Sequence, residues 1–259
     1  MSHQHPESPH RRNALRAMCA CTGAAAAAPL LGSTALRSLA LGATGTAGLT
    51  FAGVSSADTV TQTITPEAAL AMLVKGNNDF LADGLPPLPR NRARRLAIAK
   101  TQTPFAVLVS CSGSRVPPEV LFGQGLGGMF IMRVAGNTVS QEGLGSIEYA
   151  IAELGVSLVV VMGHERCGAV AAAVSVVRDG KYFPGAIGNM VQPMLPAAIS
   201  ARSESGDWVD NAVRRNVVNV VEKLKISGKL IEDPIAAGKL KIVGARYDLD
   251  DGKVDFFHR

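Results

Sequence analysis

Three short apolar runs place the strongest limit on how this 259-residue chain can fold. They span residues 104–110, 129–134 and 158–162, and none of them alternates apolar with polar side chains. Such runs are typical of strands that are buried on both faces of a parallel sheet. Between the last two, residues 140–154 carry apolar side chains at helical spacing and stop at Gly155. Strands that alternate with helices predict an α/β fold, with a central, mostly parallel β-sheet flanked by helices.

Further segments extend this pattern toward both ends of the chain. Thr65 is followed by a proline and a glutamate, a sequence that predicts the start of a helix. Residues 180–196 are expected to form a loop-rich crossing. The valine stripe of the amphipathic helix expected over residues 207–226 packs either in the core or at a subunit interface. Residues 239–247 and 253–257 flank an Asp-Asp-Gly turn and predict a β-hairpin.

The first 57 residues differ in composition from the rest. They contain the pair Arg11-Arg12, then a stretch rich in Ala, Gly and Leu that lacks acidic residues, then small residues before Asp58. This segment resembles a twin-arginine export signal that is removed before Asp58. An uncleaved membrane anchor is the alternative, but glycines and Arg37 interrupt the run of ~20 apolar residues that a span needs. We therefore expect residues 58–259 to form a single exported domain, periplasmic or extracellular, without a stable membrane span.

Net charge argues against a nucleic-acid partner. The first 57 residues hold four arginines and one glutamate, which leaves 22 basic and 20 acidic residues in the remainder. The formal net charge of that remainder is +2, against +5 for the whole chain. A basic cluster, formed by Arg90, Arg92, Arg94 and Arg95, has no interleaved aromatic residues and is expected to be a solvated helix face.

Cysteine and histidine are scarce after residue 57, where only Cys111, Cys167, His164 and His258 remain. Two thiols and one imidazole suit a tetrahedral zinc ion, and three protein ligands leave the fourth position open, as in catalytic sites. A disulfide is the alternative in an exported protein, but it does not account for His164 three residues before Cys167. Cys111 and His164 each follow a predicted strand and should converge at the carboxyl edge of the sheet. His164 and Cys167, at i and i+3, are expected to share one face of a helix start.

Several motifs in sequence order resemble the β-class carbonic anhydrases, over about residues 65–257. They are Cys111-Ser-Gly-Ser-Arg-Val-Pro-Pro-Glu119, Arg133-Val-Ala-Gly-Asn137, Gly145-Ser-Ile-Glu-Tyr-Ala150 and Gly163-His-Glu-Arg-Cys-Gly-Ala169. The resemblance implies zinc as the cofactor, with Cys111, His164 and Cys167 as its ligands. It also implies reversible hydration of carbon dioxide to bicarbonate, and a homodimer or higher homo-oligomer.

Two positions depart from the family's pattern. Gly113 stands where the family has the aspartate of an aspartate–arginine pair, and Arg115 stands at the arginine of that pair. Gly128 occupies a second position that is acidic in the family, so two carboxylates are expected to be missing near one site. Without the aspartate, Arg115 is free to bind an external anion. Loss of one such partner typically costs ~10–100-fold in metal affinity or activity.

Three functions remain open at this point. The first is a zinc-dependent carbonic anhydrase, with activity weakened by Gly113. The second is a hydrolase of another small electrophile, such as carbonyl sulfide or carbon disulfide. The third is a zinc- and anion-binding protein that no longer catalyses, because a fold alone does not fix a function.

Four further residues are candidates with plainer alternatives. Glu165 and Arg166 lie between two predicted ligands and are either active-site groups or residues of a solvated loop. Gln124 is either a pocket residue or an ordinary hydrogen-bonding loop residue. His258 is a weak candidate for a proton shuttle.

Overall fold

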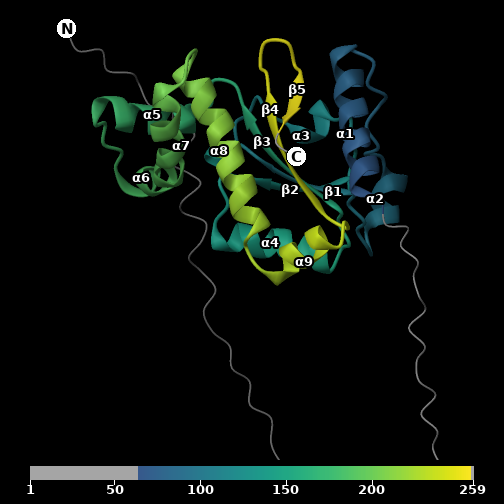
Figure 1. Cartoon of the computed structure of the whole chain (residues 1–259). Helices are drawn as coiled ribbons and strands as arrows, with labels where there is room; N and C mark the ends of the chain where they lie inside the picture. Colours follow the sequence, from purple (N-terminus) through teal and green to yellow (C-terminus); the bar gives the residue numbers. More distant parts are fainter. Residues whose placement is uncertain (1–63, 258–259) are drawn as a thin grey trace, which may run out of the picture. The chain divides into compact units, whose positions relative to one another are not determined.

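The computed structural model describes residues 64–257 (Figure 1). The predicted export signal over residues 1–57, and His258, lie outside the described residues. In the described part of the chain, no helix combines the length and the apolar character that a membrane crossing needs. The β-sheet consists of β1 Ala106–Ser110, β2 Met129–Arg133, β3 Leu158–His164, β4 Lys241–Tyr247 and β5 Val254–Phe257.

The strand order in the sheet is β2-β1-β3-β4-β5. The first four strands run parallel and β5 is antiparallel to β4, so the predicted mostly parallel sheet and the terminal hairpin are both confirmed. Every residue of β1 and of β3 is buried, which explains why their sequences lack alternation. Because β1 and β3 are parallel neighbours, the residues that follow them lie at the same edge of the sheet.

Helices cover both faces of the sheet (Figure 1). The main helices are α1 Pro66–Leu81, α2 Arg92–Ile98, α3 Pro118–Leu121, α4 Gln141–Ala152, α5 Gly168–Asp179, α6 Gly185–Val191, α7 Leu195–Ser200, α8 Trp208–Lys225 and α9 Lys229–Ala236. On one face, Leu108 and Val160 pack with side chains of α1 and α3. On the other, Val107 and Val159 pack with side chains of α4, α8 and α9.

Local capping sets several of the helix starts. The Thr65 hydroxyl accepts a hydrogen bond from the Ala68 amide at 3.2 Å, and Ser140 caps α4 in the same way through the Gly143 amide at 3.3 Å. Such side-chain caps satisfy amides that have no partner within the helix. The helix start predicted at Thr65 is therefore confirmed.

Residues 180–196 do not form the loop-rich crossing that the sequence predicts. They contain α6, the 3₁₀ turn Gln192–Met194 and the start of α7. Pro193 and Pro196 fall in the first turns of these elements, where a missing N–H leaves no hydrogen bond unmade. The prolines therefore begin helical turns here and do not prevent them.

The valine stripe of α8 packs in the core. Val213, Val217 and Val221 are at most 1% exposed, and the helix lies against β3 and β4. Of the two alternatives left open by the sequence, core packing is the one observed.

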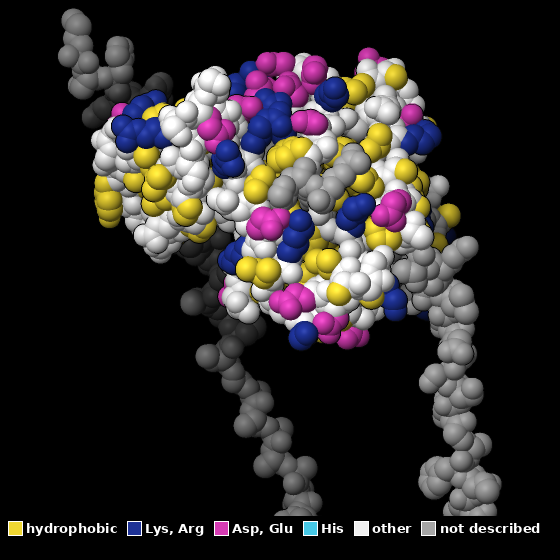
Figure 2. Space-filling model, in the orientation of Figure 1, with side chains coloured by type: hydrophobic (Ala, Val, Ile, Leu, Met, Phe, Trp, Pro, Cys, Tyr) yellow, Lys and Arg dark blue, Asp and Glu magenta, His cyan; other side chains and the backbone are white. Residues whose placement is uncertain are grey.

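Basic and acidic side chains are intermixed on the face of the molecule shown in Figure 2.

Candidate metal centre

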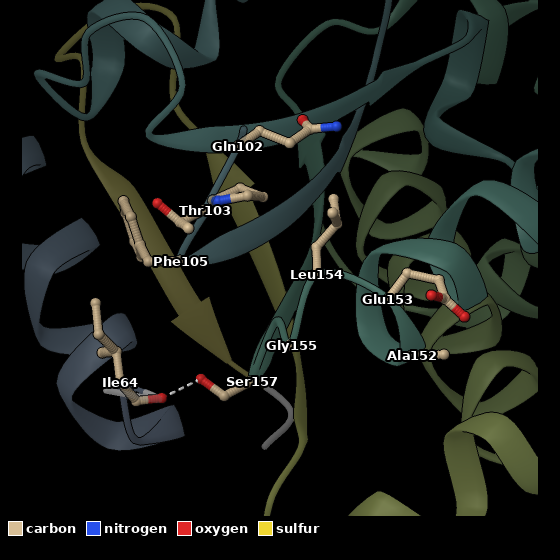
Figure 3. A pocket seen from close by; sticks show the side chains of 10 residues that line it. Ile64, Gln102, Thr103, Phe105, Ala152, Glu153, Leu154, Gly155 and Ser157 are labelled. Carbon is tan, nitrogen blue, oxygen red and sulfur yellow. Dashed lines mark hydrogen bonds between the residues drawn. The ribbon is translucent and has the colours of Figure 1, made fainter. Parts of the chain in front are cut away.

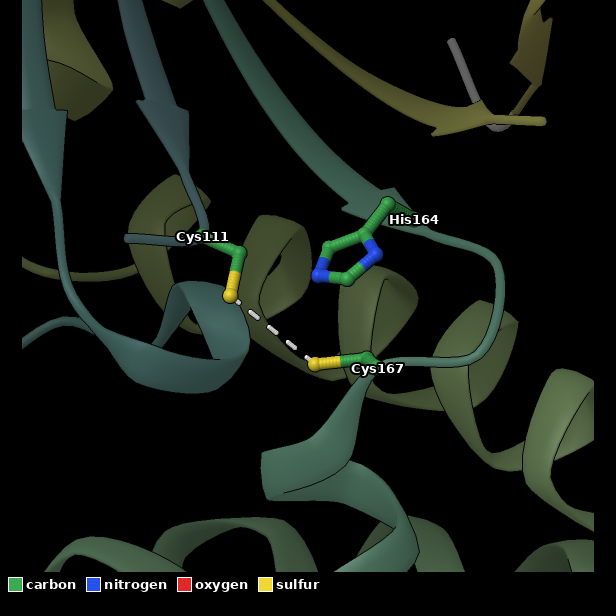
Figure 4. A group of neighbouring side chains, drawn as sticks. All are labelled: Cys111, His164 and Cys167. Atoms are coloured by element: carbon green, nitrogen blue, oxygen red, sulfur yellow. Dashed lines mark hydrogen bonds between the residues drawn. The ribbon is translucent and has the colours of Figure 1, made fainter. Parts of the chain in front are cut away.

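Cys111, His164 and Cys167 meet at the carboxyl edge of the sheet, as the sequence predicts (Figure 4). Cys111 directly follows β1, His164 is the last residue of β3, and Cys167 immediately precedes α5. Their ligand atoms all lie within 4.8 Å of one another, and the three residues are 4%, 3% and 1% exposed. Strand order alone places Cys111 and His164 side by side, because β1 and β3 are adjacent.

The spacing of the two sulfurs suits a metal and not a disulfide. Cys111 Sγ and Cys167 Sγ are 3.9 Å apart, and both cysteines are free thiols. A disulfide bond is about 2.05 Å long. Two sulfurs at about 2.3 Å from a tetrahedral zinc are about 3.8 Å apart. The pair therefore already has the separation of two ligands on one ion.

His164 presents the correct nitrogen to the thiols. Its Nδ1 lies 2.8 Å from the carbonyl oxygen of Glu165. Because a carbonyl oxygen can only accept, Nδ1 carries the proton and Nε2 keeps its lone pair. Nε2 is buried and has no hydrogen-bond partner, and Figure 4 shows the ring directed toward the two sulfurs. A buried polar atom without a partner is rare in proteins, and a metal ligand explains this one. The residues therefore fit a metal ion.

The environment of the sulfurs favours negative charge. The hydrogen bond from Cys167 is the largest effect and, with the backbone amides of Gly136 and Gly113, it lowers the pKa of Cys111 to about 3. The same hydrogen bond, together with burial, raises the pKa of Cys167. The two shifts describe a single proton shared by the pair, and a dication bound to both sulfurs would displace it.

Arg133 fixes the loop that carries Cys111, a role that the sequence did not reveal. Its Nε donates to the Cys111 carbonyl at 2.9 Å and its Nη2 to the Gly113 carbonyl at 2.7 Å. The register places Arg133 beside Ser110 at the end of β2, one residue from the ligand. The sequence did offer one signal for this role, because Arg133 lies at the carboxyl end of a predicted strand, the edge where the ligands were expected.

A turn beneath the site supplies a further contact to Cys111. The Gly136 amide lies 3.4 Å from Cys111 Sγ, and the Gly136 carbonyl accepts a hydrogen bond from the buried Asn216 side chain at 2.8 Å. Gly136 has φ of 76°, and a Cβ there would lie 2.2 Å from Met194 Sδ. Both observations explain glycine at this position. Asn216 belongs to α8, and nothing in its sequence context indicated this contact.

His164 and Cys167 are not brought together on one helix face, as the i, i+3 spacing suggested. Glu165 and Arg166 form a turn between them, and Arg166 has φ of 48°, outside the helical region. The Glu165 carboxylate accepts the Leu249 amide at 3.1 Å, and Arg166 donates to both carboxylate oxygens of Asp250. Both residues tie the ligand turn to the β4–β5 hairpin, a structural role that neither alternative, active-site group or solvated-loop residue, had anticipated.

Gly113 borders the ligand cluster directly. A Cβ built on Gly113 would lie 3.5 Å from His164 Nε2 and 3.8 Å from Cys111 Sγ, which are ordinary van der Waals distances. Arg115 donates to the Arg166 carbonyl at 3.3 Å, and within residues 64–257 its guanidinium has no acidic partner. A side chain at position 113 would therefore begin in contact with His164 and Cys111, and the glycine leaves that position empty.

Gly128 does not lie near this site, so the expectation of two missing carboxylates at one site is wrong for a single chain. The Gly128 carbonyl accepts the Phe105 amide at 3.0 Å, at the amino ends of β1 and β2. Five-residue strands separate it from Cys111, and each residue adds about 3.3 Å. Gln124 lies beside Gly128 and donates to the Phe122 carbonyl at 2.9 Å, as an ordinary loop residue does.

Two hollows lie elsewhere on the surface of the described chain. One of about 530 Å³ opens at the amino edge of the sheet, where Ser157 donates to the Ile64 carbonyl (Figure 3). It contains no cysteine or histidine. Another, of about 610 Å³, adjoins the ligand turn and is lined in part by Asp210 and Arg246, whose charges pair with each other. Neither contains the predicted ligands.

The fold and the site place this chain in the class of α/β proteins that carry a buried Cys–His–Cys group, able to hold a metal ion, at the carboxyl edge of a parallel sheet. The carbonic anhydrase family model matches residues 106–254. The chain is 41% identical over 189 residues to carbonic anhydrase 2 of Mycobacterium tuberculosis, covering 73% of this chain and 91% of that protein. It is 39% identical over 191 residues to a carbonic anhydrase of Mycolicibacterium smegmatis, covering 73% and 92%.

Solved structures agree with these relatives. A β-carbonic anhydrase of Sordaria macrospora, from a study of two tetrameric enzymes, superposes with a TM-score of 0.57 at 25% identity. The match covers 63% of this chain and 85% of that one. The chain therefore belongs to the β-carbonic anhydrase family, a family of lyases, as its motifs predicted.

Proposed function

We propose that this protein is a zinc-dependent carbonic anhydrase that reversibly hydrates carbon dioxide to bicarbonate. The observation that carries the proposal is the buried Cys111–His164–Cys167 group with its unpartnered Nε2. Nitrogen and sulfur ligands suit zinc, and three of them leave one coordination position open. Bound zinc supplies a water whose pKa is lowered to about 7. The relatives at 41% and 39% identity are named for this activity.

The surrounding residues have definable parts in that reaction. Arg133 and the Gly136 amide hold Cys111 in position through hydrogen bonds. Arg115 supplies a permanent positive charge and free N–H groups for an anionic product such as bicarbonate. Gly113 supplies no side-chain hydrogen-bond acceptor, so we expect the rate to be ~10–100-fold lower than with a carboxylate at that position.

Stopped-flow hydration of carbon dioxide tests the proposal. The zinc-loaded protein over residues 58–259 should be compared with Cys167→Ser, and zinc content should be measured in both. We expect hydration above the buffer rate that disappears in Cys167→Ser. Full zinc occupancy without hydration would overturn the proposal, and activity that appears only in Gly113→Asp would identify a zinc- and anion-binding protein that no longer catalyses.

The open space at Gly113 favours one alternative substrate class. A carbon dioxide analogue that contains the larger sulfur atom, such as carbonyl sulfide or carbon disulfide, gains room where the family has a side chain. Sulfide release from these compounds should be measured beside carbon dioxide hydration, and the comparison decides between a hydrolase and a carbonic anhydrase. A higher kcat/KM for either sulfur compound than for carbon dioxide would replace the main proposal by a hydrolase.

We also propose that the chain forms a homodimer or a higher homo-oligomer. Strand β2 is the last strand at one side of the sheet, and its apolar residues 129–132 are only partly buried. An exposed apolar edge strand invites pairing with another chain. The Sordaria macrospora enzymes are described as tetrameric. Sedimentation equilibrium should give a mass of at least two chains, and the mass of a single chain would contradict the proposal.

Export remains a proposal that rests on sequence alone. Residues 1–57 would direct the folded, zinc-loaded protein through the twin-arginine route to a periplasmic or extracellular location. A reporter fused to this segment should stay inside the cell when Arg11-Arg12 is changed to Lys-Lys. Continued export of that variant would count against the twin-arginine route.

A further inference from the structure

A side chain at position 113 would begin beside two of the predicted ligands. The Cβ position of residue 113 contacts His164 Nε2 at 3.5 Å and Cys111 Sγ at 3.8 Å, so it borders the ligand atoms themselves. No other atom lies closer to that position, apart from Gly113 itself and its chain neighbours. A carbon atom at this position would therefore make ordinary van der Waals contact with the ligand cluster.

Arg115, two residues after Gly113, carries a guanidinium that has no acidic partner in the described chain. Arg115 Nη2 donates to the carbonyl of Arg166, the residue directly before Cys167. The neighbouring carboxylates have other partners: Glu165 accepts the Leu249 amide, and Asp250 accepts both Nη atoms of Arg166. A guanidinium has five N–H donors, and the contact with the Arg166 carbonyl uses one of them.

We propose that the space beside Gly113 is a binding site for a small planar carboxylate, such as formate or acetate, which takes the place of the side chain that residue 113 lacks. The proposal deepens the proposed function and rests on it. A carboxylate matches both features: its size suits the gap, and its paired oxygens suit the guanidinium fork of Arg115. Once bound, it offers the hydrogen-bond acceptor next to the ligand cluster that glycine cannot offer.

Size and charge together select the ligand class. Chloride carries the charge but lacks two oxygens in a plane. Larger carboxylates exceed the volume of one side chain. Bicarbonate shares the planar oxygens, so it should compete with formate for the same position. Formate is therefore the probe of choice, because it is the smallest member of the class.

Saturation-transfer NMR of formate on the zinc-loaded protein tests binding without relying on activity. We expect a formate signal in the wild type that bicarbonate removes. In Gly113→Asp, whose own side chain fills the gap, and in Arg115→Gln, the signal should fall by at least about fivefold. Circular dichroism and zinc content establish that each variant is folded and loaded. Signals of equal strength in the wild type and both variants would overturn the proposal.

Hydration kinetics then test what the bound carboxylate does. Formate should raise the wild-type rate at least about threefold at constant ionic strength set with chloride, as partial recovery of the ~10–100-fold loss expected for one missing partner. Gly113→Asp should show no gain. If formate binds to an active wild type without raising its hydration rate, or raises the rate of Gly113→Asp equally, then formate does not take the place of the missing side chain. Selective binding in a protein without any hydration would overturn the proposed function and leave the binding site standing.

Discussion

Replacing Gly113 by aspartate should raise carbon dioxide hydration without disturbing the fold. The backbone at position 113 is not in the left-handed region, and the new Cβ meets its nearest neighbours at 3.5 and 3.8 Å. The carboxylate oxygens would then lie about 2.4 Å beyond this carbon, given ordinary bond lengths. They would therefore lie close to the ligand cluster, because the Cβ itself contacts His164 and Cys111.

The size of the gain follows from what the side chain adds. One hydrogen-bonding partner next to a metal centre is worth ~10–100-fold in activity. This corresponds to about 1.4–2.7 kcal/mol of barrier height. Stopped-flow measurements of kcat/KM on zinc-loaded wild type and Gly113→Asp should reveal a rise within this range.

Two matched variants distinguish the effect of the carboxylate on the rate from the effect of side-chain volume alone. Gly113→Ala adds the Cβ alone, and Gly113→Asn adds the same shape without the charge. Neither should approach the rate of Gly113→Asp. An aspartate variant that is fully zinc-loaded yet no faster than the asparagine variant would refute the assignment of a catalytic deficit to Gly113.

Three further predictions concern the support of the site. Gly136→Ala forces a Cβ to 2.2 Å from Met194 Sδ at φ of 76°, and should lower the unfolding free energy by about 2–3 kcal/mol in urea; a change under about 0.5 would contradict this. The Arg246 guanidinium, with backbone amides of the hairpin turn, lowers the pKa of Asp248 to about 2. The ionised Asp248 carboxylate therefore stabilises the folded state above the ordinary aspartate pKa near 4, and this stabilisation is lost as pH falls toward 2. Asp248→Asn should remove about 1–2 kcal/mol of unfolding free energy at pH 6 and almost none at pH 2, and an equal loss at both would contradict the pairing. Arg133→Met removes the hydrogen bonds to the carbonyls of Cys111 and Gly113, and should weaken zinc binding about tenfold in a chelator competition. Unchanged zinc affinity would contradict the positioning role of Arg133.

The sheet and the three ligands could be predicted because the sequence encodes each of them locally. Strands buried on both faces must be apolar throughout, so the segments that became β1 and β3 were visible as uninterrupted runs. Cys111 and His164 follow such runs directly, and parallel neighbours bring their carboxyl ends together. Scarcity of other thiols and imidazoles narrowed the choice of ligands further.

What the sequence left hidden depends on contacts between distant segments. Arg133 and Asn216 contact the ligand loops from β2 and from α8, and only the sheet register and helix packing determine those contacts. Gly128 was assigned to the site by resemblance, but the direction of β2 places it at the opposite edge. The prolines at 193 and 196 read as loop signals, although first turns of helices also accept them.

X-ray absorption spectroscopy at the zinc edge, combined with elemental analysis, shows whether Cys111, His164 and Cys167 hold zinc. For the protein as purified, we expect about one zinc per chain. The zinc should have two sulfur neighbours at about 2.3 Å and two nitrogen or oxygen neighbours at about 2.0–2.1 Å, one of them exchangeable. Substitution of His164 by alanine should remove one nitrogen neighbour. A protein without zinc that contains a Cys111–Cys167 disulfide would contradict the account.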